Sequence, residues 1–230
     1  NKAEAQIVRE LGKFLMDESL YKGAKPVLWS VVEKTALADA EVEYEDHTSN
    51  TIYVKFFIHT ASDKDLEGAN IVIWTTTPWT IPGNRALAFG TDLKYSLIEV
   101  ENVAEDSLVK VGDKLIFAEE LVSRVSEEIG ITSFKNLKNF NGSNLADCLC
   151  EHPFKDLGYD FDVRPFHGDF VNLEQGTGIV HIAPGHGDDD YSLGIKNGVD
   201  IVQTDQDDGR YNQHAKGFEN EHIYKVDDKI

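Results

Sequence analysis

The sequence has 230 residues, of which 41% are hydrophobic, so the chain can bury a core and is too apolar to be disordered. Its formal net charge of −19 at pH 7 excludes a protein that holds nucleic acid mainly through a basic face, and disfavours binding to anionic membranes. No apolar run approaches the roughly 20 residues of a membrane span, and the two close cysteines, Cys148 and Cys150, fit ordinary thiols of a reducing cytoplasm.

The first third of the chain predicts one helix followed by strands. Residues 3–20 place apolar side chains at helical spacing and stop near Gly23. Residues 42–44 alternate with glutamates, and with residues 52–58 they predict a β-hairpin across a turn-like segment. Residues 71–74 are a continuous β-branched and aromatic run, which predicts a buried strand that ends in a loop with two prolines.

The rest of the chain predicts more short strands than helices. The strands are expected at 95–100, 108–117 with a bend at Gly112, 179–182, 201–204 and 222–226. Residues 118–129 predict an amphipathic helix, residues 131–165 are loop-rich in pattern, and a second helix is expected after Gly187 with Asp188 as its N-cap. Short strands with scattered helices predict a β-rich α+β domain, built on a central partly closed β-barrel with peripheral helices.

Two stretches carry polar residues suited to chemistry. The first is Thr75–Asn84, where three consecutive threonines follow a buried strand and offer hydroxyl and backbone N–H groups to a small polar ligand. The same residues also suit a plain strand exit, because threonine favours strands and Thr-Pro is a common way to leave one. By themselves they leave both interpretations open.

The second stretch is GTGIVHIAPGHGDDDY, residues 176–191. Its glycines let the backbone approach a ligand closely, and histidines and carboxylates follow. His181, His186 and Asp190 could form a metal site, although their spacing matches no zinc signature. Alternatively, the three aspartates only cap a helix and complement its dipole.

Both stretches resemble signatures of one family. IWTTTPWTIPGN, residues 73–84, resembles the threonine-rich motif of isoleucyl-tRNA synthetase editing domains, and residues 176–191 resemble the second signature of the same domain. Supporting likeness occurs at 25–30, 36–44 and 207–211, so the resemblance covers nearly the whole chain. The valyl and leucyl relatives differ because their first motif resembles TTRP followed by an acidic residue.

The resemblance implies a domain without an aminoacylating core. No HIGH-like or KMSKS-like adenylate-forming signature occurs in the sequence. In this family the editing domain, also called connective peptide 1, is inserted into a Rossmann catalytic core. Residues 1–230 are therefore expected to form one editing domain, with about 1–45 and 205–230 as stems that join it to that core.

The implied activity is hydrolysis of the ester in valyl-tRNA for isoleucine, and possible additional hydrolysis of valyl-adenylate is left open. Such a domain is expected to need no cofactor and no metal. Its partners are expected to be the valyl-adenosine end of the mischarged tRNA and, in cis, the rest of the parent synthetase. We expect a cytoplasmic, monomeric protein that does not bind membranes.

The resemblance also implies roles for individual residues. Asp190 is expected to pair with the α-ammonium of the valyl group, with Asp189 as its natural control. The expected catalytic residues are Asp190, Thr75, Thr76, Thr77 and His181, and the expected substrate-binding residues are Trp79, Asn84, Gly185 and His186. No Ser-His-Asp or Cys-His set is evident, so no covalent intermediate is expected.

Three alternatives stay open at the level of sequence. One is a free-standing deacylase that acts in trans. The second is a non-catalytic aminoacyl-tRNA binding module that keeps only the fold. The third is a metal hydrolase built on His181, His186 and Asp190.

Overall fold

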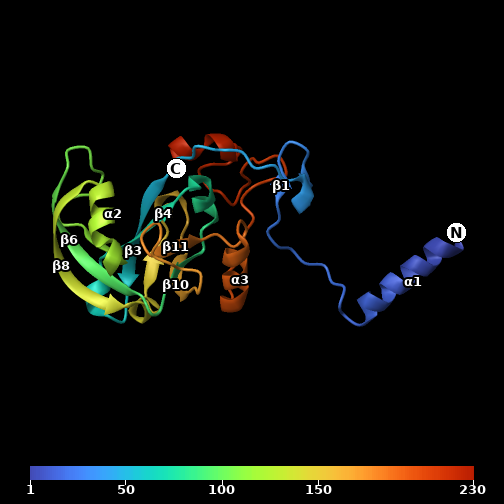
Figure 1. Ribbon diagram of the computed structural model, residues 1–230, viewed down its shortest axis with the longest axis horizontal. Helices are drawn as coiled ribbons and strands as arrows, with labels where there is room; N and C mark the ends of the chain where they lie inside the picture. The colour runs from blue at the N-terminus through green and yellow to red at the C-terminus, as the bar shows by residue number, and fades with distance from the viewer.

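The computed structural model describes residues 1–230 and shows a β-rich body from which one helix projects (Figure 1). One nine-stranded mixed sheet forms the body, in the order β11-β5-β10-β9-β3-β4-β7-β6-β8. Its strands are β3 (Ile52–Thr60), β4 (Asn70–Thr75), β5 (Ala86–Phe89), β6 (Lys94–Val103), β7 (Lys114–Ala118), β8 (Ile131–Asn141), β9 (Leu149–Glu151), β10 (Asp162–His167) and β11 (Ile179–Ile182). The expected β-rich α+β class is confirmed.

The sheet curls so that its β11 end returns toward β4 and β7. Ala118 at the end of β7 donates its N–H to the Thr177 carbonyl at 2.8 Å, and the Tyr95 hydroxyl of β6 donates to the Gly178 carbonyl at 2.7 Å. The edge strands β11 and β8 do not pair with each other, so the barrel stays partly open. Inside the curl lies the main core of 29 buried residues, among them Phe56 and Phe117.

Two helices pack on the body. Helix α2 (Val122–Glu128) buries Val125, and α3 (Asp188–Asn197) buries Leu193 against the alanines of β5. Helix α3 begins after Gly187, has three aspartates in its first turn and ends at Gly198 with φ +66°. Carboxylates near this end stabilise the helix, because the helix dipole is positive there.

The C-terminal segment packs behind the loop that follows β4. A cluster of Tyr211, Ala215, Phe218, Ile223 and Val226 is buried, and the indole of Trp79 lies against it. Short 3-10 helices complete this segment at Ile223–Lys225 and Asp227–Lys229. The C-terminal segment is thereby packed against the threonine-rich motif.

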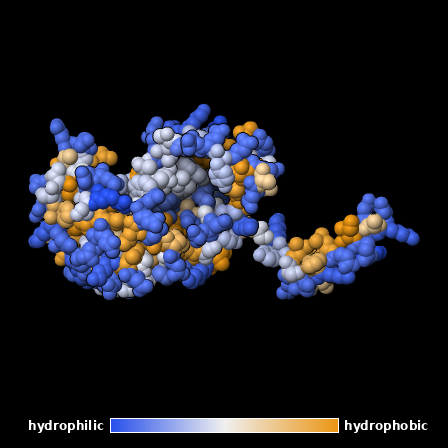
Figure 2. All heavy atoms as spheres, viewed as in Figure 1, coloured by the Kyte–Doolittle hydropathy of each residue, from blue (hydrophilic) through white to orange (hydrophobic).

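Helix α1 (Lys2–Met16) buries no residue and extends away from the body (Figure 1). Its apolar side chains form a stripe along one face, visible as an orange band in Figure 2. The stripe contains Ile7, Leu11, Phe14 and Leu15, each more than half exposed. After α1, β1 (Trp29–Ser30) and β2 (Thr35–Ala36) form a two-stranded ribbon. None of the helices combines the length and apolarity that crossing a membrane requires.

Several predicted elements are wrong. Residues 42–44 form no strand, and Tyr44 is 91% exposed; β3 pairs with β4 and β9 instead of with that segment. Residues 131–165 are not loop-rich, because they contain β8, β9 and β10. β8 is an edge strand with mostly exposed positions, so its apolar alternation is weak and its pairing with β6 determines its structure.

The boundaries of other elements also differ from the prediction. The strand expected at 108–117 is confined to β7. The strand expected at 201–204 is replaced by irregular backbone, and the strand expected at 222–226 by the 3-10 helix Ile223–Lys225, with isolated bridges at Asp205–Tyr211 and Arg210–His222. Gly187, not Asp188, is the N-cap of α3. The C-terminal segment is held by side-chain packing and isolated bridges, which no strand periodicity reveals.

Candidate functional site

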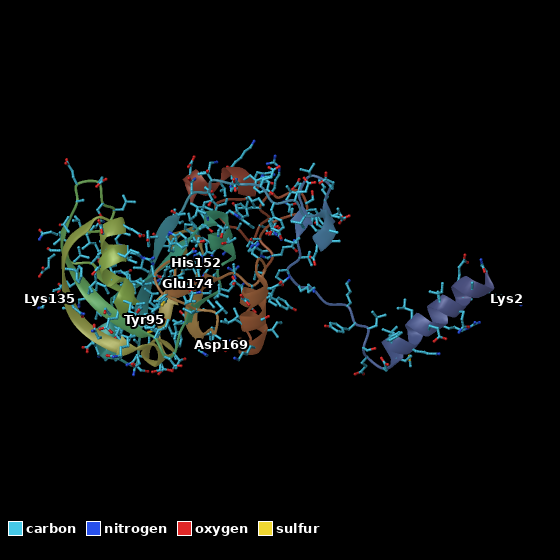
Figure 3. The ribbon with its side chains drawn as sticks, in the orientation of Figure 1. Lys2, Tyr95, Lys135, His152, Asp169 and Glu174 are labelled. Atoms are coloured by element: carbon cyan, nitrogen blue, oxygen red, sulfur yellow. The ribbon has the colours of Figure 1, made fainter.

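A cavity of about 560 Å³ opens between the end of β4, the segment leading into β11 and the start of α3. Glu174, which is labelled in Figure 3, lies on the segment before β11 and is one of the lining residues. The lining residues are Trp74, Thr75, Thr76, Thr77, Thr80, Phe170, Asn172, Glu174, Gln175, Gly176, Thr177, Gly178, Ile179, Val180, His181, Ala183, His186, Gly187 and Asp190. The two sequence motifs, about a hundred residues apart, therefore face one space.

The threonine run leaves β4 through a tight turn that its own hydroxyls stabilise. The Thr75 hydroxyl oxygen accepts from the Thr77 N–H at 3.1 Å, and the Thr80 hydroxyl donates to the Thr77 carbonyl at 2.9 Å. A 3-10 helix then runs over Pro78–Gly83 with proline at its first position, where the missing N–H costs nothing. Thr76 is exposed to the cavity. The three threonines thus differ, because the hydroxyl of Thr76 alone makes no hydrogen bond within the protein.

Asp190 points back from the first turn of α3 toward the end of β11. Its Oδ2 accepts from the Ala183 N–H at 2.7 Å. Burial raises the pKa of Asp190 to about 6, and the neighbouring charge of Asp189 adds to that rise. Asp189 itself is exposed and does not line the cavity. The two adjacent carboxylates therefore occupy different environments.

Two buried histidines form part of the same wall. His181 on β11 places its Nε2 3.0 Å from the Thr80 hydroxyl oxygen, and His186 places its Nε2 3.0 Å from the hydroxyl of Thr204. Burial lowers the pKa of His181 to about 4 and also lowers the pKa of His186. Both rings are neutral at neutral pH.

The charge of the cavity is entirely acidic. Asp190 and Glu174 are its ionisable carboxylates, and no lysine or arginine is among the lining residues. Such a space favours a cationic group and offers an anionic phosphate no cationic side chain.

The predicted substrate-binding residues other than His186 lie outside the lining. Trp79 packs edge-on against His186 with ring centroids 5.0 Å apart, and its carbonyl accepts from the Tyr211 hydroxyl. Asn84 is fully buried and donates from Nδ2 to the Ala86 carbonyl at 2.9 Å. A Cβ at Gly185 would come within 2.8 Å of the Val202 carbonyl oxygen. These three residues therefore do not face the cavity.

The structure adds residues that the motifs did not single out. Thr80 lies within the first motif, but its contact with His181 joins positions 101 residues apart, which sequence spacing cannot show. Arg124 of α2 donates to the carbonyls of Glu174 at 3.3 Å and Gly176 at 3.0 Å, and so holds the rim in place. Phe170 was missed because it lies outside both motifs, in a stretch that carries no recognisable pattern.

The proposed metal ligands do not converge. No group of three or more His, Cys, Asp or Glu side chains is arranged to hold a metal ion. His181 and His186 instead pair with the hydroxyls of Thr80 and Thr204, and Asp190 with a backbone N–H. The metal-hydrolase alternative therefore has no ligand set.

Comparison with known proteins agrees with this geometry. The family model described as tRNA synthetases class I (I, L, M and V) matches residues 1–222. The chain belongs to this family. It is 50% identical over 224 residues to the isoleucine–tRNA ligase of Pelagibacter ubique (strain HTCC1062), and 46% identical over 230 residues to that of Gluconobacter oxydans (strain 621H). These alignments cover 97% and 99% of the chain but only 24% of each relative, so this class I synthetase segment spans about a quarter of their length.

The fold is that of a synthetase editing domain. A crystal structure of the editing domain of the P. knowlesi cytosolic leucyl-tRNA synthetase superimposes with a TM-score of 0.51 at 14% identity, and 64% of each chain is covered. At that identity the likeness shows the fold alone. The family and fold expected from the two motifs, an isoleucyl-tRNA synthetase editing domain, are confirmed.

Proposed function

We propose that this segment hydrolyses the ester of valine wrongly attached to tRNA for isoleucine. The observation that carries the proposal is Asp190, a half-buried carboxylate that faces the threonine run across a cavity without cations. An aminoacyl ester carries one cationic group near its reacting carbonyl, the α-ammonium, and a carboxylate in a desolvated wall is its natural partner.

Isoleucine and valine differ by one methylene, which explains why a second site is needed. A hydrophobic pocket turns that difference into only about 1–3 kcal/mol, a limit for which isoleucyl enzymes are themselves the standard example. A second cavity that admits valine and excludes isoleucine removes the remaining errors. Here the neutral His181 and the indole of Trp74 supply bulk in the wall, and His186, backed by Trp79, fixes its limit.

Each group of lining residues then has a role in the reaction. Asp190 holds the ammonium and so orients the ester. The free hydroxyl of Thr76 and the backbone of Thr75 and Thr77 contact the carbonyl, the terminal ribose or the attacking water. An aminoacyl ester is already activated and a neighbouring ribose hydroxyl can assist, so positioning the ester and a water suffices. Asn84 and Gly185 act indirectly, by holding the loops behind the cavity.

The charge of the cavity favours the ester over the adenylate. In an aminoacyl-adenylate the phosphate is bonded to the reacting carbonyl, so it would enter the same space as Asp190. No lysine or arginine lines that space to pair with it. In the ester, the reacting carbonyl is joined to a neutral ribose, and the nearest phosphate of the tRNA lies on the far side of that ribose. We therefore assign post-transfer hydrolysis to this cavity.

The rest of the parent synthetase is the proposed partner in cis. A net charge of −19 leaves this segment poorly suited to hold the phosphates of a whole tRNA. It needs to bind only the single-stranded 3′ end, by local contacts. We propose residues 1–45 and 205–230 as the stems that join the segment to the parent synthetase. Helix α1 in the first stem buries no residue, and the second stem packs on the body through the Tyr211 cluster.

The experiment compares substrates at high protein concentration. Valyl-tRNA and isoleucyl-tRNA for isoleucine are mixed with the segment, valyl-adenylate is tested beside them, and release of amino acid is followed. We expect valine to be released from the tRNA ester much faster than isoleucine, and no acceleration of adenylate hydrolysis. Equal hydrolysis of both esters would refute the sieve, and absence of hydrolysis together with absence of binding to a valyl-adenosine analogue would refute the function.

A further inference from the structure

The contact between Thr80 and His181 determines which nitrogen of the histidine carries its proton. A threonine hydroxyl has one hydrogen to donate and two lone pairs that can accept. The Thr80 Oγ1 lies 2.9 Å from the Thr77 carbonyl oxygen, which can only accept, and 3.0 Å from Nε2 of His181. Both contacts are hydrogen bonds at once only if the hydroxyl donates to the carbonyl and accepts from the ring.

We propose that His181 acts in the reaction as a positioning residue, a fixed Nε2–H donor to Thr80, and not as a general base. The opposite tautomer turns the Thr80 hydroxyl toward the ring, breaks its bond to the Thr77 carbonyl and leaves the Nδ1–H without an acceptor. It therefore has one hydrogen bond fewer and an orphaned donor in a buried place. The role of His181 in hydrolysis rests on the proposed function, whereas the assignment of its tautomer does not.

The environment of the ring agrees with this assignment. His181 is 8% exposed, and its Nδ1 is buried without any hydrogen-bond partner. Burial lowers the pKa of His181 to about 4, so the ring is neutral near pH 7. The Nε2 lone pair is absent in the neutral donor form, and Nδ1 is shielded from water. Neither nitrogen is therefore available to take a proton from an attacking water.

The contact instead joins the two motifs. His181 is on β11, which pairs with β5, whereas Thr80 belongs to the 3-10 helix after β4. The Thr80 hydroxyl in turn holds the carbonyl of Thr77, and the Thr77 N–H is held by Thr75. One ring nitrogen thus fixes the threonine wall opposite Asp190.

Amide replacements distinguish a donor from a base. The amide nitrogen of glutamine lies near the position of Nε2, whereas that of asparagine reaches only the position of Nδ1. We expect His181→Gln to hydrolyse valyl-tRNA about ten-fold faster than His181→Asn, as one retained hydrogen bond allows. Thr80→Val should hydrolyse valyl-tRNA about ten-fold more slowly than the unmodified protein, and Thr80→Ser should retain most of the unmodified rate. Equally inactive Gln and Asn variants that are both folded would overturn the positioning role.

Nitrogen-15 NMR of the histidine ring provides the readout that does not depend on activity. The unmodified protein should show His181 as the neutral Nε2–H tautomer from about pH 6 to about pH 8, and Thr80→Val should shift the signal toward a tautomer mixture while Thr80→Ser keeps it. An Nδ1–H tautomer in the unmodified protein would overturn the proposal whether or not hydrolysis is observed. If the tautomer is Nε2–H and no ester is cleaved, only the proposed function fails.

Discussion

At the scale of single residues, Asp190 links the chemistry of the site to pH. Burial raises the pKa of its carboxyl to about 6 from an ordinary value of 3.8. A carboxyl that is protonated below that value loses its ion pair with an ammonium. We therefore expect the affinity for a non-hydrolysable valyl-adenosine amide to fall as the pH is lowered through about 6, as measured by calorimetry. Asp190→Asn should remove this dependence, and an affinity that stays constant down to pH 5 would contradict the role of Asp190.

The raised pKa of Asp190 also means that its ionised, functional form lowers the stability of the fold. Because folding raises the pKa of Asp190, the folded chain binds the proton more tightly than the unfolded chain does. This contribution to stability is fully present below about pH 4 and is lost as the pH rises through about 6. An asparagine keeps an oxygen for the Ala183 N–H but carries no charge to desolvate. The functional carboxylate therefore costs stability at neutral pH.

We expect Asp190→Asn to be more stable than the unmodified protein by about 1 kcal/mol near pH 8, a value reduced for the partial exposure of the group. The difference should shrink near pH 5.5, as measured by urea unfolding at both pH values. Asp189→Asn is the matched control and should show no comparable gain, because Asp189 is exposed. A destabilised Asp190→Asn at the higher pH would show that the carboxylate has a structural role.

At the scale of elements, the C-terminal segment supports the threonine motif from behind. The buried Tyr211 donates its hydroxyl to the carbonyl of Trp79, in the 3-10 helix that follows the threonine run. Tyr211→Phe keeps the packing but removes the hydrogen bond to that carbonyl, which costs about 1 kcal/mol. We expect altered Trp79 fluorescence and a few-fold slower ester hydrolysis. Tyr224→Phe is the control, since Tyr224 is 70% exposed; equal effects of the two changes would refute the support.

The sequence predicted the elements whose apolar pattern is strong. The buried run that became β4, the amphipathic segment that became α2 and the helix after Gly187 all formed close to the expected positions. β8 was missed because an exposed edge strand is specified by its partner β6 and not by its own alternation. The hairpin at 42–44 was predicted from local alternation, yet nothing in the body covers that segment.

The site was predictable as far as its two motifs extend. Thr75, Thr76, Thr77, His181 and Asp190 lie around one cavity, although the distance between the motifs in the sequence gives no geometry. The sequence could not show that the hydroxyls of Thr75 and Thr77 are hydrogen-bonded within the protein while that of Thr76 is free. It also could not place Trp79 behind His186, because a large aromatic residue within a motif suits either the cavity or its support.

At the scale of the whole molecule, α1 and the body are energetically separate. Helix α1 buries no residue, so removing it uncovers no core. We expect a variant that lacks residues 1–21 to unfold within about 2 °C of the full chain in differential scanning calorimetry, since about 1 kcal/mol corresponds to roughly 2–4 °C at this size. A larger decrease would show that α1 packs on the body.

The central claim is that the cavity between the two motifs reads the ammonium of a misplaced valine through Asp190. The most direct measurement is the rate of ester hydrolysis of valyl-tRNA for isoleucine by the unmodified protein, Asp190→Asn and Asp189→Asn at equal concentrations. Loss of a charge-assisted hydrogen bond corresponds to about 1.5–3 kcal/mol, or about 10- to 100-fold in rate. We predict that loss for Asp190→Asn and near-full activity for Asp189→Asn; equal rates for all three proteins would contradict the account.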